Sequence, residues 1–143
     1  MINFGKVKPL IFILIIITCV FAESCKKPSQ GATTGGGIGG TGTVSVTPTH
    51  LNLYIDSCTI YVKYGTLDAP ADGIYDDSVK CRIYPPDTIP IAIFPNLKAG
   101  IYYFYGNGYH TGYSPPYVKG ATNYTMSTEH AASIYLPTYE YVR

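Results

Sequence analysis

The sequence predicts an all-β protein whose globular part is a single antiparallel β-sandwich of about seven strands. Short runs in which apolar and polar residues alternate recur from residue 48 onward, and a period of two is that of a strand with one buried face. No window of eleven residues combines a 3.6-residue apolar period with freedom from proline and glycine, so almost no helix is expected. Pro, Gly, Asp and Asn separate the runs, as turns require.

The first 24 residues have the form of an export signal. Two lysines, Lys6 and Lys8, precede the apolar stretch Leu10–Phe21. As a helix this stretch would span roughly 18 Å, which is short of the roughly 30 Å hydrocarbon core of a membrane. A cleaved signal peptide over residues 1–24 is therefore expected rather than a permanent membrane helix.

A cysteine follows the apolar stretch in the segment AESCKKPSQ. This segment resembles a bacterial lipoprotein signal, and the resemblance implies cleavage before Cys25 and acylation of that residue. More than one acyl chain gives stable anchoring, because a single chain binds a membrane only reversibly. Lys26, rather than an aspartate, follows the cysteine, which favours the outer membrane, with a periplasm-facing position ahead of the cell surface. The alternative is ordinary secretion with a free thiol.

Residues 25–47 are expected to form the lipidated cysteine and a flexible tether. Gly, Ser and Thr fill Gln30–Thr47, and Ile38 is its one large apolar residue before Val44. A random coil of 22 residues would reach roughly 25 Å on average. The expected organisation is thus a signal peptide over 1–24, a tether over 25–47 and a β-sandwich over 48–143.

The expected strands follow in order from residue 51. Alternation predicts that Leu51, Leu53 and Ile55 share one face of the first strand. For the candidate strand Ile101–Tyr105, the same alternation predicts that Tyr102 and Phe104 point toward the core. Tyr103 and Tyr105 are expected on the other face. The remaining candidate strands are Thr59–Tyr64, Val79–Tyr84, Ile89–Phe94, Tyr117–Lys119, Asn123–Met126, Ala132–Leu136 and Tyr139–Val142.

One motif sharpens the prediction of the fold. The run Phe94-Pro-Asn-Leu97-Lys-Ala-Gly100-Ile-Tyr102 resembles the F-x-x-L-x-x-G-x-Y pattern of transthyretin-like (prealbumin-like) bacterial domains. The resemblance spans roughly residues 51–142 and implies a corner closed by Leu97 and Tyr102, with Gly100 at the entry to the next strand. With the Cys-Lys-Lys start, it suggests a lipoprotein of the Bacteroidota type. It implies little about function, because such modules serve many roles.

The charge balance disfavours nucleic acid as a partner. Removing Lys6, Lys8 and Glu23 with the signal leaves eight basic and eight acidic residues, so no basic field is expected. No cofactor is expected. The histidines His50, His110 and His130 belong to no recognisable nucleophile, zinc or glycosidase motif, and a non-catalytic protein is therefore expected.

Two further groups are candidates for structural chemistry. Cys58 and Cys81 lie on the apolar phase of their runs, so they either pair as a disulfide, which the oxidising compartment would permit, or remain buried free thiols. Four aspartates crowd one loop and are candidate Ca²⁺ ligands, although Asp-Gly is also common turn chemistry. These aspartates are Asp68, Asp72, Asp76 and Asp77.

The segment GIYYFYGNGYHTGYSPPY, residues 100–117, raises the question of a binding surface. Exposed aromatic rings with polar tips suit protein contact or sugar stacking, whereas tyrosine is also an ordinary strand residue. The candidate surface consists of Tyr103, Tyr105, Tyr109, His110, Tyr113 and Tyr117. We expect a membrane-anchored interaction module that docks another envelope protein, with a carbohydrate-binding or adhesion accessory as the alternative.

Overall fold

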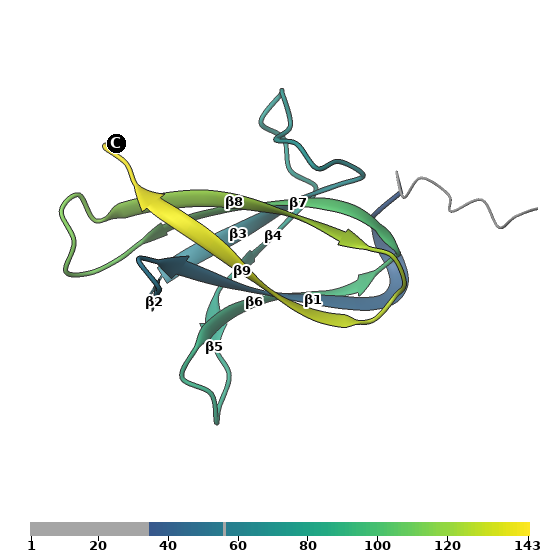
Figure 1. Ribbon diagram of the computed structural model, residues 1–143, viewed down its shortest axis with the longest axis horizontal. Coiled ribbons are helices and arrows are strands. Elements are labelled where there is room, and N and C mark those ends of the chain that lie inside the picture. Colours follow the sequence, from purple (N-terminus) through teal and green to yellow (C-terminus); the bar gives the residue numbers. More distant parts are fainter. Residues whose placement is uncertain (1–34, 56) are drawn as a thin grey trace, which may run out of the picture. The chain divides into compact units, whose positions relative to one another are not determined.

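The computed structural model describes residues 35–55 and 57–143 (Figure 1). The expected signal peptide, Cys25 and the first part of the expected tether lie outside the described residues. The described chain is all-β, as predicted, and it contains no helix long and apolar enough to cross a membrane. Its strands are β1 (Ile38–His50), β2 (Leu53–Tyr54), β3 (Ser57–Tyr64), β4 (Asp77–Lys80), β5 (Arg82–Ile83), β6 (Pro90–Leu97), β7 (Gly100–Tyr109), β8 (Tyr117–Met126) and β9 (Ala131–Glu140).

The prediction of a seven-stranded, purely antiparallel sandwich is wrong. The described residues form a nine-stranded mixed sheet in the order β4-β3-β7-β8-β9-β1-β6-β5, with β2 paired to β1. The strands β1 and β9 run parallel over eight residue pairs, from Thr43↔Ala131 to His50↔Thr138. Parallel pairing joins segments that are remote in sequence, and strand alternation within each segment carries no signal of it.

Strand β9 connects two halves of the sheet. At its end it pairs with β8 through Val118↔Glu140 and Lys119↔Tyr139, whereas most of its length pairs with β1. The sheet therefore curls, and the half β4-β3-β7-β8 faces the half β9-β1-β6-β5 across the core (Figure 1).

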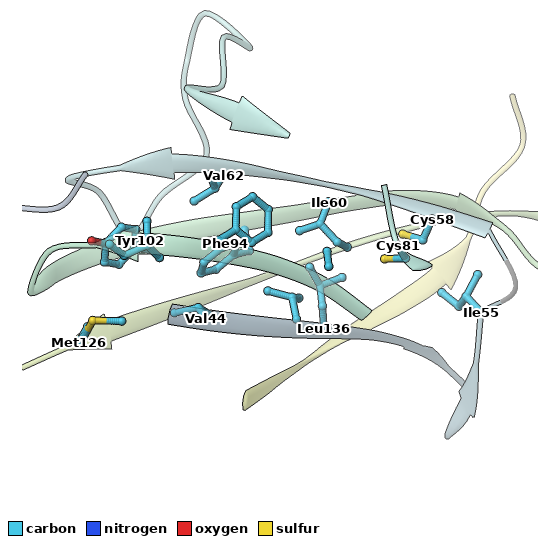
Figure 2. Close-up of a cluster of buried hydrophobic side chains, with 14 of the residues drawn as sticks. Val44, Ile55, Cys58, Ile60, Val62, Cys81, Phe94, Tyr102, Met126 and Leu136 are labelled. Carbon is cyan, nitrogen blue, oxygen red and sulfur yellow. The ribbon is translucent and has the colours of Figure 1, made fainter. Parts of the chain in front are cut away.

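The core fills the space between these halves (Figure 2). Alternate residues of each strand point inward, and each large apolar side chain that is fully buried stabilises the fold by about 1.5–3 kcal/mol. Tyr102 and Phe104 are fully buried, so their predicted inward orientation is confirmed. The other fully buried core residues are Val44, Val46, Ile55, Ile60, Val62, Ala92, Phe94, Leu97, Val118, Met126 and Leu136.

The expectation of a tether reaching Thr47 is wrong from Ile38 onward. Strand β1 lies between β9 and β6, and Val44 and Val46 are fully buried. The glycines that suggested a flexible linker permit close packing instead: a Cβ at Gly40 would lie 2.3 Å from the Leu97 carbonyl oxygen. Composition alone does not separate a flexible glycine from one that a neighbouring backbone requires.

The F-x-x-L-x-x-G-x-Y residues form a buried corner with the start of the described chain. Phe94, Leu97 and Tyr102 are all buried. The Tyr102 hydroxyl donates to the Lys98 carbonyl, and the Gly37 amide donates to the Tyr102 oxygen at 3.1 Å. Gly100 is needed because a Cβ there would lie 1.9 Å from the Gly35 carbonyl oxygen. The corner thus depends on the residues before β1.

The first predicted strand is replaced by a hairpin. Leu51 and Asn52 have φ values of 50° and 63° and connect β1 to β2 through the pairs Thr49↔Tyr54 and His50↔Leu53. A two-residue loop with both φ values positive is a type I′ turn. Leu51 and Leu53 are 64% and 52% exposed, so their predicted inward orientation is wrong, and only Ile55 is buried.

Candidate functional site: a tyrosine-walled groove

The outer face of β3, β7 and β8 carries a set of tyrosines in register. Residues directly opposite one another in antiparallel strands project to the same face. The pair Tyr61↔Tyr105 forms one row, Thr59↔Asn107 forms the next, and the end row consists of Ser57, Tyr109 and Tyr117. Small polar side chains therefore lie between two rows of tyrosine.

These rows enclose a groove of about 260 Å³, which we call the tyrosine groove. Thr59 and Asn107 occupy its middle, because the register places them between the tyrosine rows. Hydrogen-bonding groups therefore lie at the centre of the groove, with aromatic rings on either side. The complete lining is Ser57, Cys58, Thr59, Tyr61, Asn107, Gly108, Tyr109, Tyr117, Tyr141 and Arg143.

One wall is a cluster of three rings. Tyr75, from the loop between β3 and β4, stacks on Tyr105 with ring centroids 5.7 Å apart and an interplanar angle of 18°. Tyr61 contacts both rings, at 5.5 Å and 6.1 Å. Burial raises the pKa of Tyr105 and of Tyr75 above the usual value for a phenol. Both hydroxyls therefore stay protonated near neutral pH and are available as hydrogen-bond donors.

The opposite wall is built by the last residues of the chain. The Tyr141 amide donates to the Tyr117 carbonyl at 3.0 Å, and the Tyr141 hydroxyl donates to Asn107 Oδ1 at 3.1 Å. The Tyr117 ring packs between Tyr141 at 6.1 Å and Tyr109 at 5.9 Å. These contacts fix the tail beside β8 and give the groove its second aromatic side.

Two cations lie on this second wall. Lys119 Nζ is 4.6 Å from the centroid of the Tyr141 ring, and Arg143 Cζ is 5.5 Å from that of Tyr117. Both distances suit cation–π attraction, which contributes about 0.5–1 kcal/mol at exposed sites. The charged ends are thus held next to the groove by rings.

The structure separates the predicted site residues into three sets. Tyr109 and Tyr117 line the groove, and Tyr105 supports its wall through Tyr61 and Tyr75. Tyr103 shares the outer face but lies opposite Lys63, one row beyond Tyr61↔Tyr105. His110 and Tyr113 do not belong to this surface.

The prediction that His110 and Tyr113 share one surface with the other candidate residues is wrong. His110 is 7% exposed, and its Nδ1 lies 3.0 Å from Nδ1 of His50, which is 1% exposed. The Tyr113 ring packs on both histidines, at 4.5 Å and 4.7 Å. The loop between β7 and β8 packs these side chains against His50 at the end of β1, apart from the tyrosine groove.

Glu140 lies next to this histidine pair. Its Oε1 is 3.3 Å from His50 Nε2, but that nitrogen is buried without a hydrogen bond of good geometry to any described residue. Among the described residues, no group of three or more His, Cys, Asp or Glu is arranged to hold a metal ion. The contact between His50 and His110 is therefore a buried polar contact.

Sequence reasoning missed most of the groove and its supports, because only Tyr109 and Tyr117 of the lining were among the candidate surface residues. Tyr61, Tyr75, Tyr141 and Arg143 come from β3, the acidic loop and the tail. The outward orientation of Tyr61 could have been predicted from the alternation of apolar and polar residues in its strand. The approach of Tyr75 and of the tail was not, because it depends on tertiary packing across the sheet.

The acidic loop uses its aspartates locally. Asp76 accepts hydrogen bonds from Lys63 Nζ at 2.9 Å and from the Tyr64 amide at 2.7 Å. Asp72 accepts from the Ile74 amide, and Asp77 accepts from the Ser78 amide. Asp68 donates its amide to the Thr66 hydroxyl. The side chains of Asp72, Asp76 and Asp77 thus serve turns and one ion pair. Among the described residues, the four candidate Ca²⁺ ligands do not gather into a group that could hold a metal ion.

Cys58 and Cys81 are both buried free thiols in the structure. The Cys81 amide donates to the Cys58 carbonyl at 2.8 Å, and the two side chains lie next to each other (Figure 2). The contact with Cys81, followed by burial, raises the pKa of the Cys58 thiol well above its usual range. The two residues are neighbours, as expected, and the disulfide stays a prediction.

Comparisons of the chain with protein families, with curated proteins and with solved structures found no match.

Proposed function

We propose that the protein is a lipid-anchored, non-catalytic binding module of the bacterial cell envelope, and that it binds saccharides in the tyrosine groove. The observation that carries the proposal is the pairing of polar Thr59 and Asn107 with aromatic walls on both sides. A sugar ring has apolar C–H faces and polar hydroxyl edges. Aromatic side chains cover such faces while amide and hydroxyl groups bind the edges.

The sequence alone favoured an envelope protein as the partner. The shape of the site favours a saccharide instead. A concave groove of about 260 Å³ that is lined by aromatic and polar side chains suits a small polar ligand, because small-molecule sites are concave and combine apolar walls with a few polar groups. The rings are also held rigidly by one another, at 5.7 Å for Tyr75 and Tyr105. Rigid aromatic anchors lose little conformational entropy on binding.

The position of the groove fits attachment through Cys25. Nine residues lie between Cys25 and Gly35, and the ten steps of the chain from one to the other span at most about 35 Å. The Ile101 amide donates to the Gly35 carbonyl at 2.6 Å at the start of β7, whereas Asn107–Tyr109 lie at its end. Seven strand residues cover roughly 24 Å. The groove is thus remote from the end of the domain that leads to the proposed anchor.

The transthyretin-like classification and the outer-membrane location are parts of the same proposal. The burial of Phe94, Leu97 and Tyr102 at one corner supports the classification. The Cys25 context supports the location, with the periplasmic side ahead of the cell surface.

A glycan array with the detergent-solubilised, acylated protein tests the function. We expect binding to a defined set of oligosaccharides, and a loss of about tenfold or more in affinity for Tyr109→Ala, because stacking on an aromatic ring is removed. The matched control is Tyr84→Ala, an exposed tyrosine between β5 and β6 that is absent from the groove lining. Absence of saccharide binding, or equal loss in both variants, would contradict the proposal.

A further inference from the structure

The cations beside the tyrosine groove have no carboxylate partner among residues 35–55 and 57–143. Within the described part of the chain, the carboxylate ion pairs are His50 with Glu140 and Lys63 with Asp76. Lys119 and Arg143 contact the faces of Tyr141 and Tyr117 instead. A ring orients a cation without neutralising its charge, so both cations remain able to bind an anion.

A third cation belongs to the same row of the sheet. The register places Lys80 opposite Thr59, Thr59 opposite Asn107, and Asn107 opposite Lys119. Because opposite residues share a face, the polar middle of the groove has a lysine on each side along this row. Lys80 and Lys119 are both exposed.

Among the residues that the structure describes, no acidic side chain offsets this charge inside the groove. None of the described residues that line it is acidic. The acidic residues before β4 lie beyond the wall formed by Tyr61 and Tyr75, where Asp76 is paired with Lys63 at 2.9 Å. Glu140, which precedes Tyr141, lies 3.3 Å from His50 instead. The positive charge is therefore local, although the chain from Cys25 onward is balanced.

We propose that the ligand of the tyrosine groove is an acidic saccharide, whose carboxylate or sulfate groups are bound by Lys119, Arg143 and Lys80. This inference rests on the proposed function and specifies its ligand class. The Arg143 guanidinium offers a planar fork of donors to a carboxylate or sulfate, and each lysine offers a point charge. The sugar rings stack on the tyrosines while Thr59 and Asn107 bind hydroxyl groups.

The experiment compares matched ligands on the full acylated protein in detergent. Isothermal titration calorimetry measures the affinity for an oligogalacturonate and for the same oligosaccharide with its carboxyl groups reduced to alcohols. A sulfated dextran oligomer and unmodified dextran form the second pair, which separates sulfate from carboxylate recognition. We expect the acidic member of at least one pair to bind about tenfold tighter. That preference should shrink at high salt, because exposed charges are screened.

Substitutions test which residues cause the preference for the acidic ligand. The double substitution Lys119→Gln and Arg143→Gln should bring the ratio of acidic to neutral affinity close to one. Arg82→Gln removes an exposed cation of β5, outside the groove lining, and should leave the ratio unchanged. An unchanged ratio in the double variant would overturn the inference.

The outcomes also separate this inference from the function on which it rests. Equal affinity for acidic and neutral members would overturn the acidic preference and leave saccharide binding intact. Binding of no saccharide would overturn both. Tighter binding of an oligothymidylate than of any saccharide would also overturn the inference, because stacking platforms with cations suit single-stranded nucleic acid as well.

Discussion

The Tyr141 hydroxyl donates a hydrogen bond to Asn107 Oδ1 at 3.1 Å, although the two residues are 34 positions apart in sequence. This contact fixes the tail after β9 over the end of β7. It brings the Tyr141 ring against Tyr117 and under Lys119. One hydrogen bond therefore connects the polar middle of the tyrosine groove to its aromatic and cationic wall.

Tyr141→Phe should weaken saccharide binding while the fold is kept. The substitution removes one exposed hydrogen bond of about 1 kcal/mol, which corresponds to roughly a fivefold loss in affinity by calorimetry. Tyr139→Phe is the control, since Tyr139 is 68% exposed on the adjacent strand and does not line the groove. Equal affinities for the two variants would show that the Tyr141–Asn107 contact does not position the wall.

The buried histidine pair should be energetically coupled. His50 and His110 approach through their Nδ1 atoms at 3.0 Å, so one nitrogen donates and the other accepts. Each single substitution by alanine leaves a buried partner unsatisfied. A double-mutant cycle by urea denaturation should give a coupling free energy of about 1 kcal/mol.

His130→Ala is the control for that cycle. His130 is exposed and contacts the Thr128 carbonyl and the Tyr124 hydroxyl, so its loss should change the free energy of unfolding by less than about 1 kcal/mol. Strict additivity of His50→Ala and His110→Ala would contradict the coupling.

Asp76→Asn should reduce stability in a pH-dependent manner. Partial burial raises the pKa of Asp76, but the hydrogen bonds from the Tyr64 amide and from Lys63 outweigh burial and leave that pKa below its usual value. The carboxylate therefore stabilises the fold above the unfolded pKa, and this contribution disappears as the pH falls through the lower, folded pKa.

Urea denaturation at several pH values measures this effect. The difference between wild type and Asp76→Asn should be about 0.5–1 kcal/mol at pH 7, because the pair is solvent-screened. It should vanish well below a pH of about 4, the usual range for aspartate. A difference that grows on acidification would have the wrong sign and would refute this role of Asp76.

Cys58 and Cys81 should form a disulfide in protein isolated from the envelope. Cys81, between β4 and β5, is joined to β3 by its backbone hydrogen bond to Cys58, and the expected export would place both residues in an oxidising compartment. A loop of about 20 residues gives roughly 3 kcal/mol of stabilisation in the chain-entropy model. Alkylation under denaturing conditions without reductant, followed by mass spectrometry, should detect no modified thiol at either position. Two alkylated cysteines would rule the pairing out.

Strand alternation predicted part of this fold because it reports burial within one segment. It placed Tyr102 and Phe104 in the core, and both are fully buried. It failed for Leu51 and Leu53, because the type I′ turn at Leu51–Asn52 reverses the chain where the alternation continues. A local period contains no information about where the chain turns back.

The remaining errors share a cause in long-range packing. The glycine-rich segment before Val44 read as a tether, yet the close approach of Leu97 to Gly40 makes it part of β1. His110 was predicted to be an exposed loop residue. It contacts His50, which lies 60 positions earlier in the sequence. The groove was predicted only where its residues lie in one segment, namely Tyr109 and Tyr117, with Tyr105 behind its wall. Its other wall depends on the tail crossing β8.

The most direct test of the central claim is to map a bound saccharide by nuclear magnetic resonance. Isotope-labelled, acylated protein in detergent micelles would be titrated with an oligosaccharide selected on the array, and the backbone amide shifts would be followed. We expect the largest changes at Thr59, Asn107, Gly108, Tyr117 and Arg143, which belong to the lining of the tyrosine groove. Changes concentrated on the outer face of β9 and the β1–β2 hairpin, with the groove unaffected, would contradict this expectation.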